Sequence, residues 1–207
     1  IVGLGNIGLR HLEGLSNLED SNLNIYLFDK SNNYISKFAN NFKNLEKKIK
    51  INILSNEIEN LSKIDFDISI ISTDATERVK ILKLIAKNIN SKLIIIEKPI
   101  CNSIEDLNFL KKNKFHNVFV NFPRRYCNWH KEIKDKLLKD YHNQIFQVDI
   151  TERNLGIACN SSHYVDLIHS WTGQYPIKVD NSKLLTWKKS KRNGFFDLDG
   201  TIKIIFS

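Results

Sequence analysis

The sequence predicts an α/β fold in which a doubly wound parallel sheet is followed by a smaller α+β domain. Two observations support this prediction. From residue 1 to about residue 121, apolar segments of strand length alternate with segments of helical periodicity, and such alternation requires right-handed crossovers between parallel strands. After residue 121 the predicted strands follow one another without long helices between them, which is typical of an open, mostly antiparallel sheet.

The first part of the chain contains candidate strands separated by candidate helices. The strand at 67–72 is almost entirely apolar or small, as expected for a parallel strand covered on both faces. Apolar residues recur at helical spacing through 76–89. Ser103 is a candidate N-cap for the next helix. Two acids follow in the first turn of that helix, where the helix dipole favours negative charge. The predicted strands are 1–2, 23–28, 50–54, 67–72, 92–96 and 116–120, and the predicted helices are 9–15, 31–42, a short one through Ile58 and Leu61, 76–89 and one from Ser103.

The second part of the chain has a different pattern. Its predicted elements are a helix at 129–138, a strand at 144–152, a short helix at 162–171, and strands at 178–187 and 200–206. We therefore predict two domains, 1–122 and 123–207. The chain begins and ends inside predicted strands and does not start with Met, so we expect a fragment truncated at both ends, with an incomplete second sheet.

Composition favours a soluble globular protein. The chain has 207 residues, 42% of them hydrophobic and 26% charged, which is ordinary for such proteins. The net charge of +8 comes from lysines interleaved with acids, so we expect no nucleic-acid partner. No apolar run reaches the roughly 20 residues of a membrane span, and three separated cysteines imply no disulfide framework. We expect a cytoplasmic protein without a membrane partner.

A glycine-rich turn follows the first strand. Gly3, Gly5 and Gly8 have the G-x-G-x-x-G spacing, with a predicted strand before them and a predicted helix after them. In a dinucleotide site the first glycine permits the tight turn, the second lets the backbone approach the pyrophosphate, and the third lets helix and strand pack closely. The helix N-terminus then faces the phosphates. The alternative is a glycine-rich turn without a ligand.

Asp29 strengthens the nucleotide interpretation. It closes the second strand, 29 − 8 = 21 residues after Gly8, against a spacing of about 20 for the acid that binds the ribose hydroxyls. A carboxylate there would repel the 2′-phosphate of NADP, so NAD is the predicted cofactor and NADP is less favoured, although Lys30 partly offsets the repulsion. Ligands of such sheets bind at the carboxyl ends of the strands. The predicted cofactor-binding residues are Gly3, Gly5, Asn6, Ile7, Gly8, Asp29, Thr73, Glu97, Lys98 and Asn121.

Two residues are candidates for proton chemistry. Lys98 ends the fifth strand and could hydrogen-bond a substrate hydroxyl or act as its general base, but a lysine at a strand end is more often a surface residue. His163 lies on the polar side of a predicted helix, where an imidazole can transfer a proton near neutral pH, although in isolation a histidine capped or solvated near a helix start is the better interpretation. A metal site of Cys159, His163 and Asp166 is a weaker alternative, and we predict no metal. Arg125, Asn160 and Asp166 are the predicted substrate-binding residues.

Together these residues resemble the Gfo/Idh/MocA family of nucleotide-dependent oxidoreductases, the glucose–fructose oxidoreductase and inositol dehydrogenase type. The resemblance covers nearly the whole chain and rests on the glycine motif with Arg10-His11, Asp29, Thr73, Glu97-Lys98-Pro99, Asn121 with Arg124-Arg125-Tyr126, and His163 with Asp166. It implies a Rossmann domain, then a domain whose open sheet covers the active site and mediates homo-oligomerisation. It also implies that Lys98 is the catalytic lysine and His163 the acid/base histidine.

The chain departs from the family pattern at three positions. Cys159 stands where the family commonly has an Asp, Asp74 replaces a common Pro, and Arg78 replaces a common His. The resulting prediction is an NAD-dependent dehydrogenase that transfers a hydride between nicotinamide and a hydroxyl or keto carbon of a sugar, cyclitol or nucleotide-sugar-like substrate. The alternative is a non-catalytic nucleotide-binding sensor on the same scaffold. The Lys98–Pro99 peptide bond is predicted to be cis.

Overall fold

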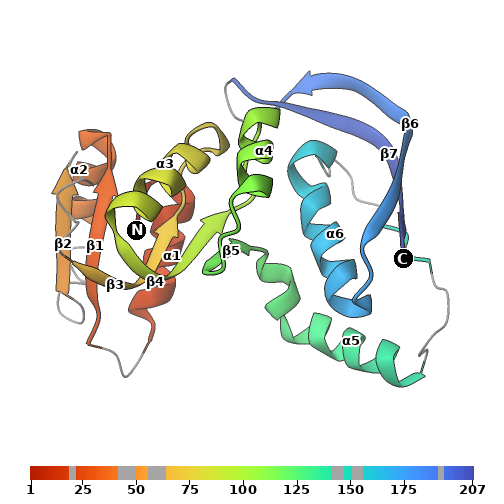
Figure 1. Ribbon diagram of the computed structural model, residues 1–207, viewed down its shortest axis with the longest axis horizontal. Coiled ribbons are helices and arrows are strands. Elements are labelled where there is room, and N and C mark those ends of the chain that lie inside the picture. Colours follow the sequence, from red (N-terminus) through yellow and green to blue (C-terminus); the bar gives the residue numbers. More distant parts are fainter. Residues whose placement is uncertain (19–21, 42–49, 56–63, 141–146, 151–155, 191–193) are drawn as a thin grey trace. The chain divides into compact units, whose positions relative to one another are not determined.

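The computed structural model describes residues 1–18, 22–41, 50–55, 64–140, 147–150, 156–190 and 194–207. The chain divides into two compact units, Ile1–Asn121 and Phe122–Ser207, whose helices and strands are labelled in Figure 1. The sequence placed the boundary one residue later, between 122 and 123. The functional roles assigned to the two domains, dinucleotide binding for one and substrate binding with oligomerisation for the other, stay predictions.

The first unit is built on a parallel sheet. Its strands are β1 (Asn24–Asp29), β2 (Lys50–Ser55), β3 (Asp65–Ile71), β4 (Asn90–Glu97) and β5 (Val118–Asn121). β1 pairs with β2, and β4 pairs with both β3 and β5. Val2 joins the two groups, because it forms parallel bridges to Phe28 and to Ile71. The order is therefore β2, β1, the Val2 segment, β3, β4, β5, with the start of the chain at the centre, and the predicted doubly wound sheet is confirmed.

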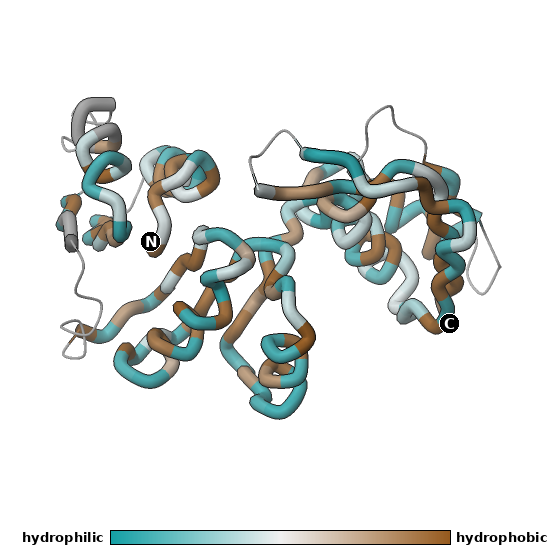
Figure 2. Tube along the Cα trace, turned by 90° about the horizontal axis from the view of Figure 1, so that it is seen from above, coloured by the Kyte–Doolittle hydropathy of each residue, from teal (hydrophilic) through white to brown (hydrophobic). Residues whose placement is uncertain are grey.

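Helices cross over between these strands. They are α1 (Asn6–Ser16), α2 (Asn32–Asn41), α3 (Ala75–Asn88) and α4 (Ile104–Lys112), and polar and apolar stretches alternate along them in Figure 2. The predicted cap of α4 is confirmed, because the Ser103 hydroxyl accepts the backbone N–H of Asp106 at 3.1 Å. The helix predicted through Ile58 and Leu61 lies outside the described residues.

The sheet of the first unit carries an apolar core on each face. Consecutive strand residues point to opposite faces, and accordingly Leu27 belongs to a cluster with Leu12 and Phe38, whereas Phe28 packs against a second cluster that contains Leu82. The first cluster lies under α1 and α2 and the second under α3. Burial of both faces explains why the strands of this unit are rich in isoleucine and leucine rather than alternating with charged residues.

The second unit combines helices with an antiparallel hairpin. Its elements are the 3₁₀ turn η3 (Pro123–Tyr126), α5 (Asn128–Asp140), α6 (Ile157–Thr172), β6 (Pro176–Lys189) and β7 (Phe196–Phe206). β6 and β7 pair antiparallel, which confirms the predicted sheet type. The strand predicted at 144–152 is wrong where it can be compared, since residues 147–150 form no strand; the remainder lies outside the described residues.

The α6 helix begins five residues earlier than the sequence indicated, at Ile157 instead of 162. The cause is a distant cap, since the Asp197 carboxylate on β7 accepts the backbone N–H of Ala158 at 2.8 Å. Gly156 precedes the helix with φ +66°, and a Cβ there would collide with the Asp197 carboxylate. A local sequence pattern cannot reveal this contact, because its two ends are 39 residues apart.

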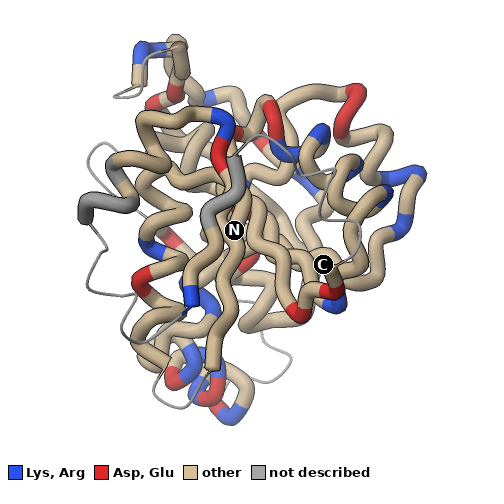
Figure 3. Tube along the Cα trace, turned by 90° about the vertical axis from the view of Figure 1, so that its left-hand side faces the viewer, with Lys and Arg blue, Asp and Glu red and all other residues tan. Residues whose placement is uncertain are grey.

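Two further observations concern the distribution of charged and apolar residues. Lysines and arginines alternate with acids along the trace in Figure 3. Within the described ranges, no helix combines the length and the apolar character that crossing a bilayer requires.

Two glycines of α1, Gly8 and Gly14, allow a test of its packing. A Cβ on Gly8 would collide with the Gly3 carbonyl, whereas a Cβ on Gly14, in the same helix, would meet no atom within 4 Å. We expect Gly8→Ala to lower the free energy of unfolding by about 2 kcal/mol, through overpacking. Gly14→Ala should raise it by about 0.5 kcal/mol, because alanine favours the helix. Urea unfolding of both variants, followed by circular dichroism, measures the difference, and equal effects would contradict the close packing.

Candidate active site

The glycine turn lies where the first strand passes into α1. Gly3 has φ +94°, and a Cβ there would lie 2.9 Å from the Thr73 backbone nitrogen, so both conformation and space require glycine. The Gly3 N–H donates to the Phe28 carbonyl at 2.9 Å. α1 then begins after Gly5, which provides no side-chain cap. Asn6 and Ile7, two further predicted cofactor contacts, are exposed in the first turn of the helix.

Two observations fit this turn to a bound nucleotide. A Cβ on Gly5 would meet no protein atom within 4 Å, so the protein itself leaves this position open, in contrast to Gly3 and Gly8. Thr73, at the carboxyl end of β3, buries its hydroxyl oxygen without a hydrogen-bond partner among the described residues. An uncapped helix N-terminus with open space beside it suits a phosphate, and a buried hydroxyl without a partner suits a polar ligand atom.

Asp29 ties the end of β1 to the glycine turn. It is 8% exposed. One carboxylate oxygen accepts the Leu4 N–H at 2.7 Å, and the other accepts the Ser31 N–H at 2.8 Å. Each oxygen has a second lone pair, so the carboxylate can hold the turn and still accept a ribose hydroxyl. The ribose role stays a prediction.

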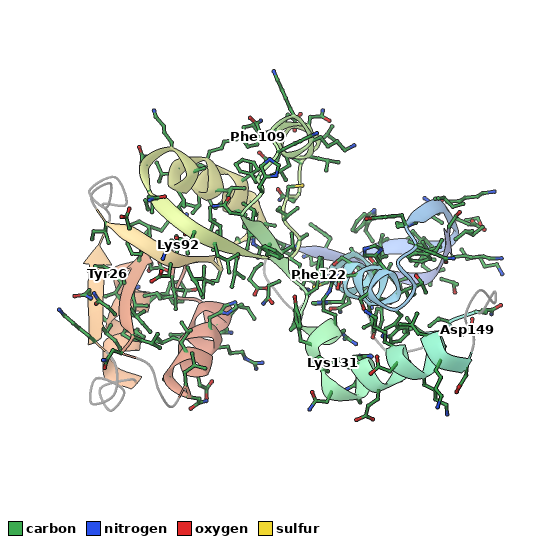
Figure 4. The ribbon with its side chains drawn as sticks, turned by 60° about the horizontal axis from the view of Figure 1, so that its bottom comes forward. Tyr26, Lys92, Phe109, Phe122, Lys131 and Asp149 are labelled. Atoms are coloured by element: carbon green, nitrogen blue, oxygen red, sulfur yellow. The ribbon has the colours of Figure 1, made fainter. Side chains whose placement is uncertain are left out.

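A buried polar cluster surrounds Glu97 at the end of β4. His11 from α1 donates through Nε2 to Glu97 Oε1 at 2.8 Å, and Asn121 from β5 donates to the same oxygen at 2.6 Å. The Arg78 guanidinium from α3 donates to the Pro99 carbonyl. Figure 4 shows α1 and α3 on opposite sides of the strands, so the cluster receives a side chain from each face of the sheet. The structure thus brings together Glu97 and Asn121, two of the predicted cofactor residues.

Burial and charge act in opposite directions on Glu97. Burial alone would raise the pKa of this carboxyl group, but the hydrogen bonds from His11 and Asn121, with the charges of His11 and Arg78, hold the pKa below its usual value of 4.5. Burial lowers the pKa of Arg78, and the charge of Glu97 opposes that shift. The two buried charges therefore compensate each other.

Lys98 follows Glu97 directly and is half-buried. The Lys98–Pro99 peptide bond is cis, as predicted. Lys98 thus lies between two residues that neighbouring elements hold in place, Glu97 by hydrogen bonds to its side chain and Pro99 by a hydrogen bond to its carbonyl.

In the second unit, contacts between η3 and α6 surround His163. The Arg125 guanidinium forms a two-point ion pair with the Asp166 carboxylate, with Nε 2.9 Å from Oδ2, and this hydrogen bond raises the pKa of Arg125. The His163 ring meets the edge of Phe122, with centroids 5.7 Å apart. The predicted substrate residues Arg125 and Asp166 are therefore paired with each other. Asn160 lies half-buried one turn before Tyr164 on α6.

Two residues of the Glu97 cluster, His11 and Arg78, were not among the predicted site residues. A signal for Arg78 was present, because it lies three residues after Ala75 and four before Leu82, on the buried side of α3, where a charged residue requires a partner. His11 was part of the family resemblance, with Arg10 after the glycine motif, but no local pattern indicated its contact with Glu97. Among the described residues, no group of three His, Cys, Asp or Glu side chains is arranged to hold a metal ion.

The parallel sheet, with its glycine turn and uncapped helix at the carboxyl ends of the strands, defines a dinucleotide-binding α/β protein. A family model described as an oxidoreductase family with an NAD-binding Rossmann fold matches residues 1–140. The chain belongs to this family, Gfo/Idh/MocA, as the sequence predicted.

Solved structures share this fold. Myo-inositol 2-dehydrogenase from Lactobacillus plantarum has a TM-score of 0.65 at 19% identity over 89% of this chain. Myo-inositol dehydrogenase from Lactobacillus casei, solved in complex with NAD(H) and myo-inositol, has a TM-score of 0.68 at 16% identity over 98% of this chain. The chain spans 58% and 62% of the lengths of these two proteins. No curated protein sequence matches the chain significantly.

The Glu97 cluster generates a prediction about acid stability. The pKa of Glu97 is lower in the folded protein than in the unfolded chain. Ionised Glu97 therefore stabilises the fold at pH values above the pKa of the unfolded chain, and this stabilisation is lost as the pH falls through the pKa of the folded protein. We expect Glu97→Gln to lower the free energy of unfolding by about 1 kcal/mol near neutral pH, with a smaller difference at about pH 4. Urea unfolding at both pH values measures this. The exposed Glu105, changed to Gln, is the control, and an equal pH dependence of both variants would contradict the prediction.

Proposed function

We propose that the chain is the nucleotide-binding part, with a portion of the second domain, of an NAD-dependent dehydrogenase. The proposed substrate is a cyclitol, sugar or nucleotide-sugar-like alcohol or ketone. The observation that carries the proposal is the glycine turn, in which the protein's own packing explains Gly3 and Gly8 but leaves the space at Gly5 open. Membership of an oxidoreductase family with an NAD-binding fold supports it, as does the likeness to inositol dehydrogenases.

The proposed chemistry assigns distinct tasks to the chain's residues. When bound, NAD would supply the hydride acceptor or donor. Lys98 would polarise or deprotonate the reacting hydroxyl, and His163 would accept or return a proton. Arg125 and Asp166 hold η3 against α6 through their ion pair, and in this proposal they help to orient substrate together with Asn160. Asp29 would favour NAD over NADP, and NADPH is expected to bind more weakly than NADH.

Several features of the whole protein belong to the same proposal. The partner is a small molecule, and the complete protein is expected to be a cytoplasmic homo-oligomer that assembles through its second sheet.

One observation favours a rival function, that of a sensor that binds nucleotide without turnover. Cys159 replaces an acid that family members commonly carry before the histidine, and its loss would weaken proton transfer.

Gly5→Ala separates a nucleotide site from a purely structural turn. The added methyl group meets no protein atom within 4 Å, so the free energy of unfolding should stay within about 0.5 kcal/mol of the parent. The dissociation constant for NADH should rise by about tenfold or more, because the methyl group occupies the space of the pyrophosphate. Fluorescence titration with NADH measures the change, and Gly14→Ala is the control. An unchanged dissociation constant would argue against the site.

Lys98→Ala separates the enzyme from the sensor. If Lys98 carries the proton step, turnover should fall by about a hundredfold or more, while NADH affinity stays within about threefold. The assay follows the absorbance of reduced nicotinamide with NAD and a panel of cyclitols, sugars and nucleotide sugars. Lys92→Ala, at an exposed lysine of the same strand, is the matched control. Nucleotide binding without turnover on any substrate would favour the sensor.

A further inference from the structure

At the end of β4, the residues before and after Lys98 are both held by hydrogen bonds from other elements. Glu97, the residue before it, is 7% exposed and holds two hydrogen bonds on a single carboxylate oxygen. Pro99, the residue after it, has its carbonyl bound to the Arg78 guanidinium. The donors come from α1, α3 and β5, so three neighbouring elements determine where the backbone of Lys98 lies.

One of these hydrogen bonds comes from α1, the helix that follows the glycine turn. His11 belongs to α1, six residues after Gly5, and its Nε2 reaches Glu97 Oε1 at 2.8 Å. A lysine amine is carried on a flexible stem, so its position depends on how firmly the backbone beneath it is held. Misplacement of a reacting group by about 1 Å can cost about a hundredfold in rate.

We propose that His11 is a positioning residue, which holds Glu97 and thereby places the Lys98 amine relative to the nucleotide held by α1. The proposal rests on the proposed function, in which Lys98 acts on the substrate. It also explains why both His11 and Asn121 donate to the same Glu97 oxygen. Asn121 keeps Glu97 attached to β5, and His11 adds the link from the sheet to α1.

The geometry separates this role from a purely structural one. The His11 side chain is only 19% exposed, so glutamine, which fills most of its space, is the variant that separates the hydrogen bond from packing, and Asn121 still donates to Glu97 in either variant. The backbone of the glycine turn is held by separate hydrogen bonds, from Gly3 to Phe28 and from Leu4 to Asp29. Loss of His11 should therefore affect catalytic turnover more than nucleotide affinity.

The kinetic test compares His11→Ala with His11→Gln in the protein that contains this chain. A glutamine amide can still donate to Glu97, so it should restore function that alanine removes. We expect His11→Ala to lower kcat by about tenfold while the NADH dissociation constant changes by less than about twofold. His11→Gln should stay within about threefold of the parent. His116→Ala, at an exposed histidine of the same unit, should change neither quantity.

Two kinetic outcomes would overturn the proposal. A loss of NADH affinity with kcat preserved would assign His11 to the nucleotide site itself. An equal loss of kcat in the alanine and glutamine variants would show that the hydrogen bond to Glu97 is not what matters.

A second measurement keeps the result independent of the substrate. Reductive methylation with isotope-labelled formaldehyde gives each lysine amine an NMR resonance, and the Lys98 resonance is identified by its absence in Lys98→Arg. Its chemical shift should move in His11→Ala and return in His11→Gln. If the protein turns over no substrate, the proposed function fails, but the Lys98 resonance still shows whether His11 determines the position of the Lys98 amine. An unmoved resonance in His11→Ala would overturn the positioning role.

Discussion

The close approach of α1 to the first strand is the constraint on which the first unit depends. At Gly8 any side chain would collide with the Gly3 carbonyl, and at Gly3 the backbone adopts a conformation that other residues rarely accept. With helix and strand this close, the Leu4 amide reaches the Asp29 carboxylate and the His11 ring reaches Glu97. The helix N-terminus, the ribose-binding candidate and the end of β4 are thereby arranged around one turn.

The two buried charged side chains near Lys98, Glu97 and Arg78, carry opposite charges that compensate each other. Glu97 and Arg78 are each about 7% exposed, and an isolated charge at either position would be strongly unfavourable. His11 and Asn121 add hydrogen bonds that a carboxylate needs when water is excluded. The second unit uses a similar device, since the Arg125–Asp166 pair fixes η3 on the helix that carries His163.

The sequence predicted features that depend on local pattern. The glycine spacing, the strand periodicity and the cap at Ser103 each require only a few neighbouring residues, and the fold followed from such patterns. The family followed from a resemblance that also needed short motifs such as Glu97-Lys98-Pro99 and His163 with Asp166. The predictions failed where distant residues decide the outcome. The start of α6 depends on Asp197, and the contact of His11 with Glu97 spans 86 residues. No local periodicity encodes such contacts. The predicted strand at 144–152 also lacks strand structure at 147–150, for which the structure gives no explanation.

The Asp197 cap has a consequence for the order in which the second unit is built. The acceptor for the Ala158 amide lies 39 residues further along the chain, on a strand of the β6–β7 hairpin. During synthesis the first turn of α6 therefore remains without this acceptor until the ribosome has released β7. The hydrogen bond that caps the helix carrying His163 can form only after β7 has been synthesised, so this end of α6 depends on the hairpin.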